Sequence, residues 1–360
     1  MPRDGQVRQD RPRDADLIRR GLGIEGTYLE NLLVAFLPCT FTVGSVGPKT
    51  STRLSSDKMA LAFPLPTTAP ILATVGQKLC ERIVFPRAAP GLALAALQLT
   101  SIMTTNFKAG TMGLYGKFYR DSDVDEFALP SKVGMAIVYS PALVVSMLAL
   151  KTAWLARESI AMSGNGREVL IAAMLTLHFL KRVVEVIFVH IYSGRMDRGS
   201  TLGIAAYYAL MTKMVVHQQA VVPISITNGK LPVWPFVLFF VGETGNLWHH
   251  ASLARLRKKN VDAEYVLPSE GLFEFITCPH YSFEILAWVG LALTAAHANA
   301  YLLALSMGVY LAGRSDATRE WYAQKFGNDG TYLGASVRGR ARLFPSDQNL
   351  FGSCSLADDI

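Results

Sequence analysis

Charged residues and cysteines are both scarce in this chain of 360 residues, and each shortage excludes a class of protein. Charged residues make up 18% of the chain and hydrophobic residues 51%, whereas a soluble domain carries about 25% charged residues. This balance excludes a disordered chain and argues against a simple globular one. The four cysteines lie far apart and form no C-x-x-C pair, which excludes a disulfide scaffold and a cysteine-based zinc site.

Motifs of several soluble enzyme classes are also absent. The chain has no Walker A loop, no G-x-S-x-G and no H-E-x-x-H, and its histidines show no metal-ligand spacing with carboxylates, so we expect no metal. The "GLGIEG" at 21–26 follows the polar "DLIRR" instead of an apolar strand, which argues against a dinucleotide-binding loop. The N-terminus mixes Arg and Asp without an apolar core, so we do not expect a cleavable signal peptide.

The chain contains several long stretches with few or no charged residues. A helix that spans a bilayer needs about 20 mostly apolar residues. The candidates are 59–77, 88–107, 133–150, 202–227 with only Lys213, 231–254 with only Glu243, 285–313, the charged helix 168–192 and the weaker segment 28–47. Because 285–313 is too long for one untilted helix, we predict a turn at 297–299. The sequence therefore predicts an all-α polytopic bundle of about seven core transmembrane helices in a lipid bilayer, with extra N-terminal spans left open.

Basic residues orient this bundle. The loop 255–280 opens with four basic residues, Arg255, Arg257, Lys258 and Lys259. Because cytosolic loops of membrane proteins carry an excess of Lys and Arg, we place this loop on the cytosolic side. The net charge of +7 has the same explanation, and we expect no nucleic-acid partner.

The helix 168–192 contains a polar stripe in "HFLKRVVEVIFVH" (178–190). At about 100° per residue, Lys181, Arg182 and Glu185 fall within about 60° of His178. Ionisable groups inside a membrane helix are costly, so the stripe indicates a functional site. The structural alternative is an Arg182–Glu185 ion pair that only fixes helix packing.

Two further polar groups lie in the C-terminal half. The segment "GNLWHHASLARLR" (245–257) places three polar side chains near the end of an apolar stretch: Asn246, His249 and His250. In "CPHYSFEILAW" (278–288), Pro279 suits a helix start. On that helix Tyr281, Glu284 and Trp288 share one face. The alternative for His249, His250 or His280 taken singly is a purely structural role.

These three stretches, in this order and spacing, resemble the membrane-embedded steroid 5α-reductase superfamily, and within it the very-long-chain trans-2-enoyl-CoA reductases. The resemblance extends to "REWYAQKF" (319–326) and "RARLFP" (340–345). The resemblance covers residues about 110–345. Together with the composition it gives a solvated tail at 1–25, N-terminal membrane segments at 26–107, a reductase membrane domain at 108–345 that is steroid 5α-reductase-like from about 170, and a C-terminal tail at 346–360.

The resemblance also implies roles for individual residues. Tyr281 matches the proposed proton donor, and Lys181 a lysine required near it. The positions that match the NADPH site are Asn246, Arg257, Glu284, Arg314, Tyr322 and Arg340. The residues expected to contact the substrate are His178, Arg182, Glu185 and Tyr139. Tyr139 stands where steroid reductases carry a glutamate that meets the steroid ketone, which argues against a steroid substrate.

The implied activity is NADPH-dependent reduction of the C=C bond of trans-2-enoyl-CoA in very-long-chain fatty acid elongation. The expected protein is a multi-pass protein of the endoplasmic reticulum membrane that takes an acyl-CoA or lipid substrate and works beside other elongation enzymes. A steroid or polyprenol reductase of the same superfamily is the alternative. A non-enzymatic membrane scaffold or a transporter is a third, and the presence of both Tyr281 and Lys181 argues against a scaffold.

Overall fold

The computed structural model describes residues 83–107, 128–156, 166–192, 194–223, 233–259 and 266–326, with 340, 341 and 343. The chain divides into two compact units, Met1–Arg82 and Ile83–Ile360. All described residues belong to the second unit, and the spans predicted at 28–47 and 59–77 lie outside them.

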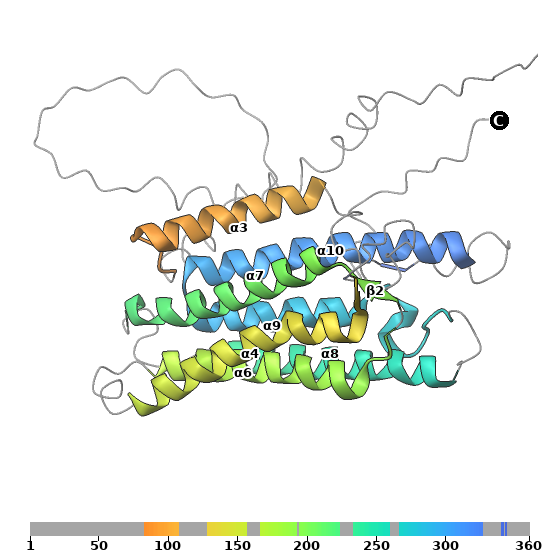
Figure 1. The fold of residues 1–360 in the computed structure, drawn as a ribbon, viewed down its shortest axis with the longest axis horizontal. Helices are drawn as coiled ribbons and strands as arrows, with labels where there is room; N and C mark the ends of the chain where they lie inside the picture. The colour runs from red at the N-terminus through yellow and green to blue at the C-terminus, as the bar shows by residue number, and fades with distance from the viewer. Residues whose placement is uncertain are drawn as a thin grey trace, which may run out of the picture. The chain divides into compact units, whose positions relative to one another are not determined.

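The described residues form a helical bundle (Figure 1). Its seven α-helices are α3 (Ala89–Phe107), α4 (Ser131–Leu155), α6 (Arg167–Val184), α7 (Arg198–His217), α8 (Val233–Lys259), α9 (Pro279–Ala295) and α10 (Ala298–Phe326). A π-helical turn, η4 (Glu185–Val189), continues α6, and two 3₁₀ turns are η5 (Gln218–Val221) and η7 (Gly271–Glu274). The prediction of an all-α fold with about seven helices is confirmed for this part of the chain.

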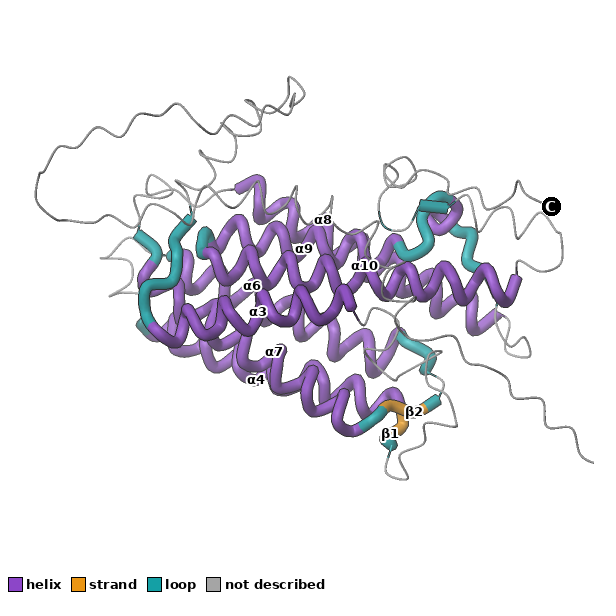
Figure 2. The backbone as a smooth tube through the Cα atoms, turned by 90° about the horizontal axis from the view of Figure 1, so that it is seen from above, coloured by secondary structure: helices purple, strands orange, loops and turns teal. Residues whose placement is uncertain are grey.

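Each helix packs against particular neighbours. α4 lies against both α6 and α7, α8 lies along α9, and α10 contacts α9 and α3. The strands β1 (Leu129–Pro130) and β2 (Arg195–Met196) pair antiparallel at the start of α4, where Figure 2 shows them in orange. This pair holds the beginnings of α4 and α7 at one end of the bundle.

Glycines bring α8 and α9 into backbone contact. A Cβ on Gly290 would lie 2.6 Å from the backbone nitrogen of Phe239, and a Cβ on Gly242 would lie 2.7 Å from the carbonyl oxygen of Phe283. Small residues allow such close approach of two helices. The contact matters for the site because Gly242 immediately precedes Glu243. The Glu243 carboxylate therefore lies close to α9.

The turn between α9 and α10 confirms the break predicted at 297–299. Ala296 adopts the left-handed conformation with φ of 51° and ends α9. His297 is fully buried beside it, and Val84 forms two backbone hydrogen bonds to residues 296 and 298. The segment before α3 is thereby attached to this turn.

α7 is shorter than the predicted span 202–227, and that boundary was wrong. The helix ends at His217, and the chain passes through η5 to an extended Val222. Pro223 follows, and the residue before a proline is disfavoured in the helical region. At the other end of α7, Asp197 caps the first turn. Its carboxylate accepts a 2.6 Å hydrogen bond from the Ser200 backbone, and this bond lowers the pKa of Asp197.

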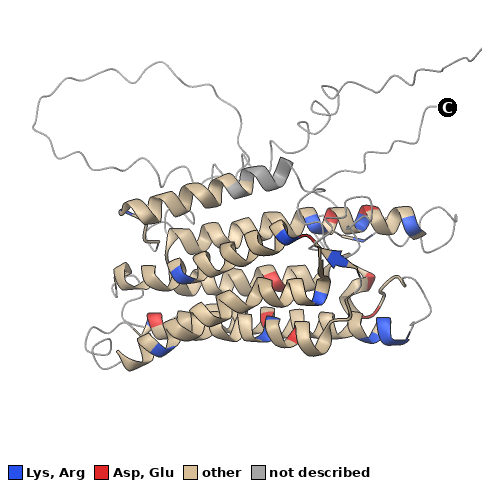
Figure 3. Ribbon diagram, viewed as in Figure 1, with Lys and Arg blue, Asp and Glu red and all other residues tan. Residues whose placement is uncertain are grey.

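Uncharged residues dominate the helices, and charged side chains gather toward the end of the bundle where β2 lies (Figure 3). Among the described helices, α4 alone is both long and apolar enough to cross a bilayer by composition, with a mean hydropathy of 2.1. Buried charges interrupt several of the others, including Lys181 in α6 and Glu243 in α8.

Candidate functional site

A buried polar cluster forms where α6, α8 and α9 meet. The Lys181 ammonium lies 2.9 Å from Glu243 Oε2 and donates a 2.5 Å hydrogen bond to Asn246 Oδ1. Glu243 Oε1 lies 2.7 Å from His178 Nδ1, and the other ring nitrogen of His178 lies 3.6 Å from Glu284 Oε1. The predicted stripe on α6 therefore faces two neighbouring helices, which supply its counter-charges.

Arg182 links this cluster to α4. Its Nη1 donates to Glu185 Oε2 at 2.7 Å, and its Nη2 donates to the Tyr139 hydroxyl at 2.7 Å. The Arg182–Glu185 pair expected from the sequence is thus formed, and it also reaches other helices. Glu185 has no solvent exposure, and its Oε1 lies 3.1 Å from His250 Nδ1 on α8.

Asn246 connects the cluster to the first turn of α9. Its Nδ2 donates a 2.8 Å hydrogen bond to the carbonyl oxygen of His280. Pro279 occupies the first turn of α9, as predicted. Tyr281 follows His280 on this helix. It is half-buried, and its ring centroid lies 4.2 Å from that of His280. Lys181 thus reaches the α9 turn beside Tyr281 through Asn246, while its own contacts are with Glu243, Asn246 and Glu185.

Of the residues expected at the cofactor, Asn246 and Glu284 belong to the buried cluster. The remaining four lie on other parts of the bundle. Arg257 at the end of α8 donates to the Ile191 carbonyl at 3.1 Å, and Arg340 donates to the Pro268 carbonyl at 2.7 Å. Arg314 is buried and Tyr322 half-buried on α10. Burial lowers the pKa of Arg340, and the nearby Tyr322 opposes that shift. Arg340 and Tyr322 are therefore neighbours, whereas Arg257 is attached to the segment after η4.

The segment around Arg340 is attached to the loop before α9. Ala341 accepts a 2.8 Å hydrogen bond from the Thr277 backbone and donates one of 2.8 Å to Phe275. The hydroxyl of Ser282 donates to the Leu343 carbonyl. These bonds place the residue after Arg340 against the loop that leads to Tyr281, although 60 residues of sequence separate them.

Several buried donors have no hydrogen-bond partner among the described residues, and they include Arg182 Nε, Trp288 Nε1 and Arg340 Nε. Buried polar groups are normally paired, and these three can only donate. Trp288 lies beside His178, with ring centroids 4.7 Å apart. The donor set therefore fits a ligand rich in acceptor oxygens, such as a phosphate or a carbonyl compound.

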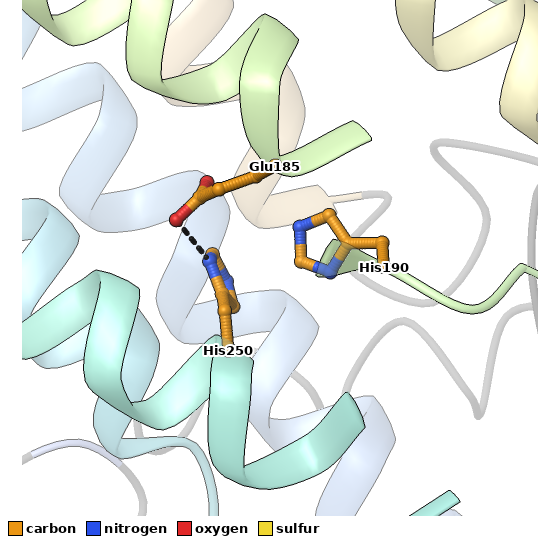
Figure 4. Close-up of side chains that lie close together, drawn as sticks. All are labelled: Glu185, His190 and His250. Atoms are coloured by element: carbon orange, nitrogen blue, oxygen red, sulfur yellow. Dashed lines mark hydrogen bonds and ion pairs between the residues drawn. The ribbon is translucent and has the colours of Figure 1, made fainter. Parts of the chain in front are cut away.

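One cluster has the residue types of a metal site. Glu185, His190 and His250 offer ligand atoms within 4.8 Å of one another (Figure 4). Arg182 already donates to Glu185, and its Nη1 lies 3.3 Å from His250 Nδ1. A guanidinium in that position repels a divalent cation, so the cluster is better suited to hydrogen bonding and proton transfer.

Sequence reasoning did not include Glu243, His190 or His250 among the site residues. Glu243 had a usable signal, because it is the one Asp, Glu, Lys or Arg within the apolar stretch 231–254, and such residues indicate function by default. His190 and His250 lie in the two polar segments 178–190 and 245–257 that the sequence singled out, but their proximity was not predictable, since it depends on how α8 packs against the end of η4.

Comparisons with known proteins find similarity to several reductases. Residues 203–332 match the family described as 3-oxo-5-alpha-steroid 4-dehydrogenase. The very-long-chain enoyl-CoA reductase of Dictyostelium discoideum is 30% identical over 163 residues, which cover 42% of this chain and 52% of that protein. Polyprenal reductase 1 of Arabidopsis thaliana is 27% identical over 197 residues, covering 45% of this chain and 62% of that protein.

Human 3-oxo-5-alpha-steroid 4-dehydrogenase 1 is 35% identical over 91 residues, covering 25% of this chain and 35% of that protein. The chain thus matches about half the length of the Dictyostelium relative and about a third of the human one. The match at 203–332 includes α8, α9 and α10, which carry Asn246, Tyr281 and Arg314. Residues 203–332 are therefore similar to the steroid 5α-reductase superfamily, and the resemblance predicted from the sequence is confirmed over that range.

Proposed function

We propose that the protein reduces the C=C bond of a trans-2-enoyl-CoA with NADPH. One observation carries this proposal: Lys181 on α6 is hydrogen-bonded to Asn246 on α8, which in turn is bonded to the α9 turn that holds Tyr281. A cation and a phenol are thereby held on adjacent elements of a buried, otherwise apolar bundle. Both residues are those that the resemblance assigns to proton donation.

The chemistry requires a hydride at the β carbon, a proton at the α carbon and a donor for the thioester oxygen in between. Bound NADPH would supply the hydride. Tyr281 gives its hydroxyl proton to the α carbon, and a nearby cation makes a phenol a better donor. Arg182 and Trp288 have buried donors available for a substrate oxygen, and removing one such donor typically costs about 10²–10³ in rate.

Phosphates would be held by the arginines toward the β2 end. Arg340 keeps Nε available while its Nη1 is bound to Pro268, and arginine suits charge-assisted recognition of phosphates. Arg257, Arg314 and Tyr322 complete the set expected for the cofactor, with Asn246 and Glu284 toward the nicotinamide.

A steroid reductase is the second candidate, favoured by the 35% identity to the human steroid enzyme. Against it, Tyr139 occupies the position expected to meet a steroid ketone, and its hydroxyl is already bonded to Arg182. A polyprenal reductase is similarly related. The enoyl-CoA is favoured because the glutamate that steroid reductases use at this point is replaced by Tyr139.

We place the bundle in the endoplasmic reticulum membrane as a multi-pass protein, beside other enzymes of fatty acid elongation. Large apolar side chains on the outside of the helices support a lipid environment. Those more than half exposed include Val144, Leu148, Trp154, Phe188 and Trp234. Contiguous exposed apolar surface of this kind indicates contact with a membrane or a partner.

The test is a substrate competition with the full chain in lipid nanodiscs. We expect NADPH oxidation with trans-2-hexadecenoyl-CoA, and the saturated acyl-CoA as the product identified by mass. Testosterone and a polyprenal are the parallel substrates. Reduction of either one in preference to the enoyl-CoA would contradict the substrate assignment, and absence of NADPH oxidation with all three would contradict a reductase.

A further inference from the structure

Three histidine rings lie in succession between the end of η4 and Tyr281. The ring centroids of His190 and His250 are 4.6 Å apart, and those of His250 and His280 are 5.3 Å apart. The ring of His280 is 4.2 Å from that of Tyr281. The histidines come from three separate elements, so their alignment is produced by the packing of the bundle.

The central ring is held in place by charged groups. Glu185 Oε1 lies 3.1 Å from His250 Nδ1, and Figure 4 shows the His190 ring turned toward both. Glu185 is fully buried and His250 nearly so, whereas His190 and His280 are half-buried. The charged and titratable groups around His250 are Lys181, Arg182, Glu185, His190, His249 and His280.

Histidine suits proton transfer, since its ordinary pKa lies near neutrality and it can take up and release a proton. Transfer requires donor and acceptor atoms about 2.6–3.2 Å apart, or one water between them. Ring centroids at 4–5 Å are compatible with either arrangement. Glu185 beside the central ring favours its protonated form, and Arg182, whose Nη1 lies 3.3 Å from the same ring nitrogen, opposes it, so the ring holds an extra proton only during transfer.

We infer that His190, His250 and His280 form a relay that returns a proton to Tyr281 after each turnover. The inference rests on the proposed function. In each cycle the O–H bond of Tyr281 breaks and its proton forms the new C–H bond at the α carbon. The hydride that reduces the β carbon comes from NADPH, which becomes NADP⁺.

The tyrosinate then takes a proton from His280, which is resupplied by His250 and finally by His190. His250 accepts the proton at Nε2 and releases it to His280 from the same nitrogen, because its Nδ1 faces Glu185. One proton enters from solvent in each turnover, so charge and atoms balance with the one hydride transferred. Without the relay, Tyr281 would complete a first reduction and then wait for a proton.

The experiment separates the first turnover from the later ones. His280→Gln and His190→Gln are each mixed with excess NADPH and trans-2-hexadecenoyl-CoA, and NADPH fluorescence is followed by stopped flow. The bond from Asn246 to residue 280 uses the backbone carbonyl, so His280→Gln leaves it intact. His217→Gln, at an exposed histidine at the end of α7, is the matched control.

We expect both relay variants to give a burst of one turnover per enzyme at the wild-type rate. A slow phase reduced by about tenfold or more should follow, since positioned proton transfer typically contributes about 10²–10⁴. Added imidazole should restore the slow phase in the variants and leave the control unchanged. A fast later phase, equal slowing of both phases, or failure of imidazole to restore the rate would overturn the relay. A wild-type protein that reduces no enoyl-CoA would overturn the proposed function and the relay with it.

Discussion

The Lys181 ammonium of α6 and the Glu243 carboxylate of α8 lie 2.9 Å apart, with 11% and 5% of their side chains exposed. They are opposite charges within one buried cluster, in which Glu243 also meets His178 at 2.7 Å and Lys181 also lies 3.8 Å from Glu185. Removing one of the two leaves the other with less counter-charge around it, whereas removing both does not. This difference can be measured.

We expect Glu243→Gln and Lys181→Met each to destabilise the protein by about 3–5 kcal/mol. The double variant should lose clearly less than the sum of the two. Unfolding in detergent, followed by intrinsic fluorescence against denaturant, measures the coupling. The control is the exposed pair Arg255–Glu270, at 3.3 Å with 49% and 59% of the side chains exposed, where alanine variants should be additive. Additivity at Lys181 and Glu243 would contradict a mutually dependent pair.

Tyr281→Phe should abolish most of the activity and leave NADPH binding near its normal strength. The change removes one hydroxyl and almost no volume, so the fold is expected to survive. Tyr207→Phe is the matched control, because that hydroxyl contacts Ser306 away from the cluster and should keep its rate. If Tyr281→Phe keeps more than about a tenth of the rate, the hydroxyl contributes less than about 1.4 kcal/mol to the transition state and is not the donor.

Arg340→Ala and Arg257→Ala should each weaken NADPH binding by about tenfold or more, with a smaller effect on the acyl-CoA. A charge-assisted hydrogen bond to phosphate is worth roughly 1.5–3 kcal/mol. Equilibrium binding of NADPH, measured by its fluorescence, gives the dissociation constants. Arg255→Ala serves as the control, since Arg255 is exposed and pairs with Glu270. Unchanged NADPH affinity in both variants would show that the two residues were assigned wrongly.

Gly290→Ala should destabilise the bundle, while Gly203→Ala should stabilise it by about 0.5–1 kcal/mol. A Cβ at residue 290 would lie 2.6 Å from backbone atoms of both Phe239 and Pro235, whereas one at residue 203 has nothing within 4 Å. Both glycines are helical, so propensity alone predicts the same sign. Thermal unfolding of the two variants in the same detergent tests the prediction, and a stabilised Gly290→Ala would show that α8 and α9 are not in backbone contact.

A cysteine at Lys258 should react with an impermeant maleimide from the cytosolic face, and one at Lys213 from the lumenal face. Both side chains are exposed, and they lie near the ends of α8 and α7, which run in opposite directions along the bundle (Figure 1). The experiment uses sealed microsomes and a background without the four native cysteines. The reverse pattern would overturn the predicted orientation, and reaction of both from one side would contradict a bundle that spans the membrane.

Helix positions could be predicted from the sequence because they depend on local composition. The stretches around 88–107, 133–150 and 231–254 coincide with α3, α4 and α8. The polar stripe of α6 was also predictable, since its period follows from helix geometry. The end of α7 was missed because it depends on Pro223 and on the burial of Gln218 and Gln219.

Partners across helices could not be predicted in the same way. Lys181 was expected beside Tyr281, and the structure gives it Glu243 and Asn246 as neighbours. The helix that faces the polar stripe is determined in part by the glycine contact between α8 and α9. The periodicity of a single helix contains no information about that contact. The pairing of Tyr139 with Arg182 is likewise set by how α4 packs on α6.

The π-helical turn η4 contains five residues, Glu185–Val189, and leads directly into His190. A π turn holds one more residue than the α turn that it replaces. The wider turn therefore accommodates the extra residue, and the chain after it keeps nearly the direction that a regular helix would give. A deletion of one residue within 186–189 would let α6 continue as a regular helix, with Glu185 kept against His250 and Arg182 and with His190 still at its end. The length of this turn can thus change by one residue while the three side chains of Figure 4 stay together.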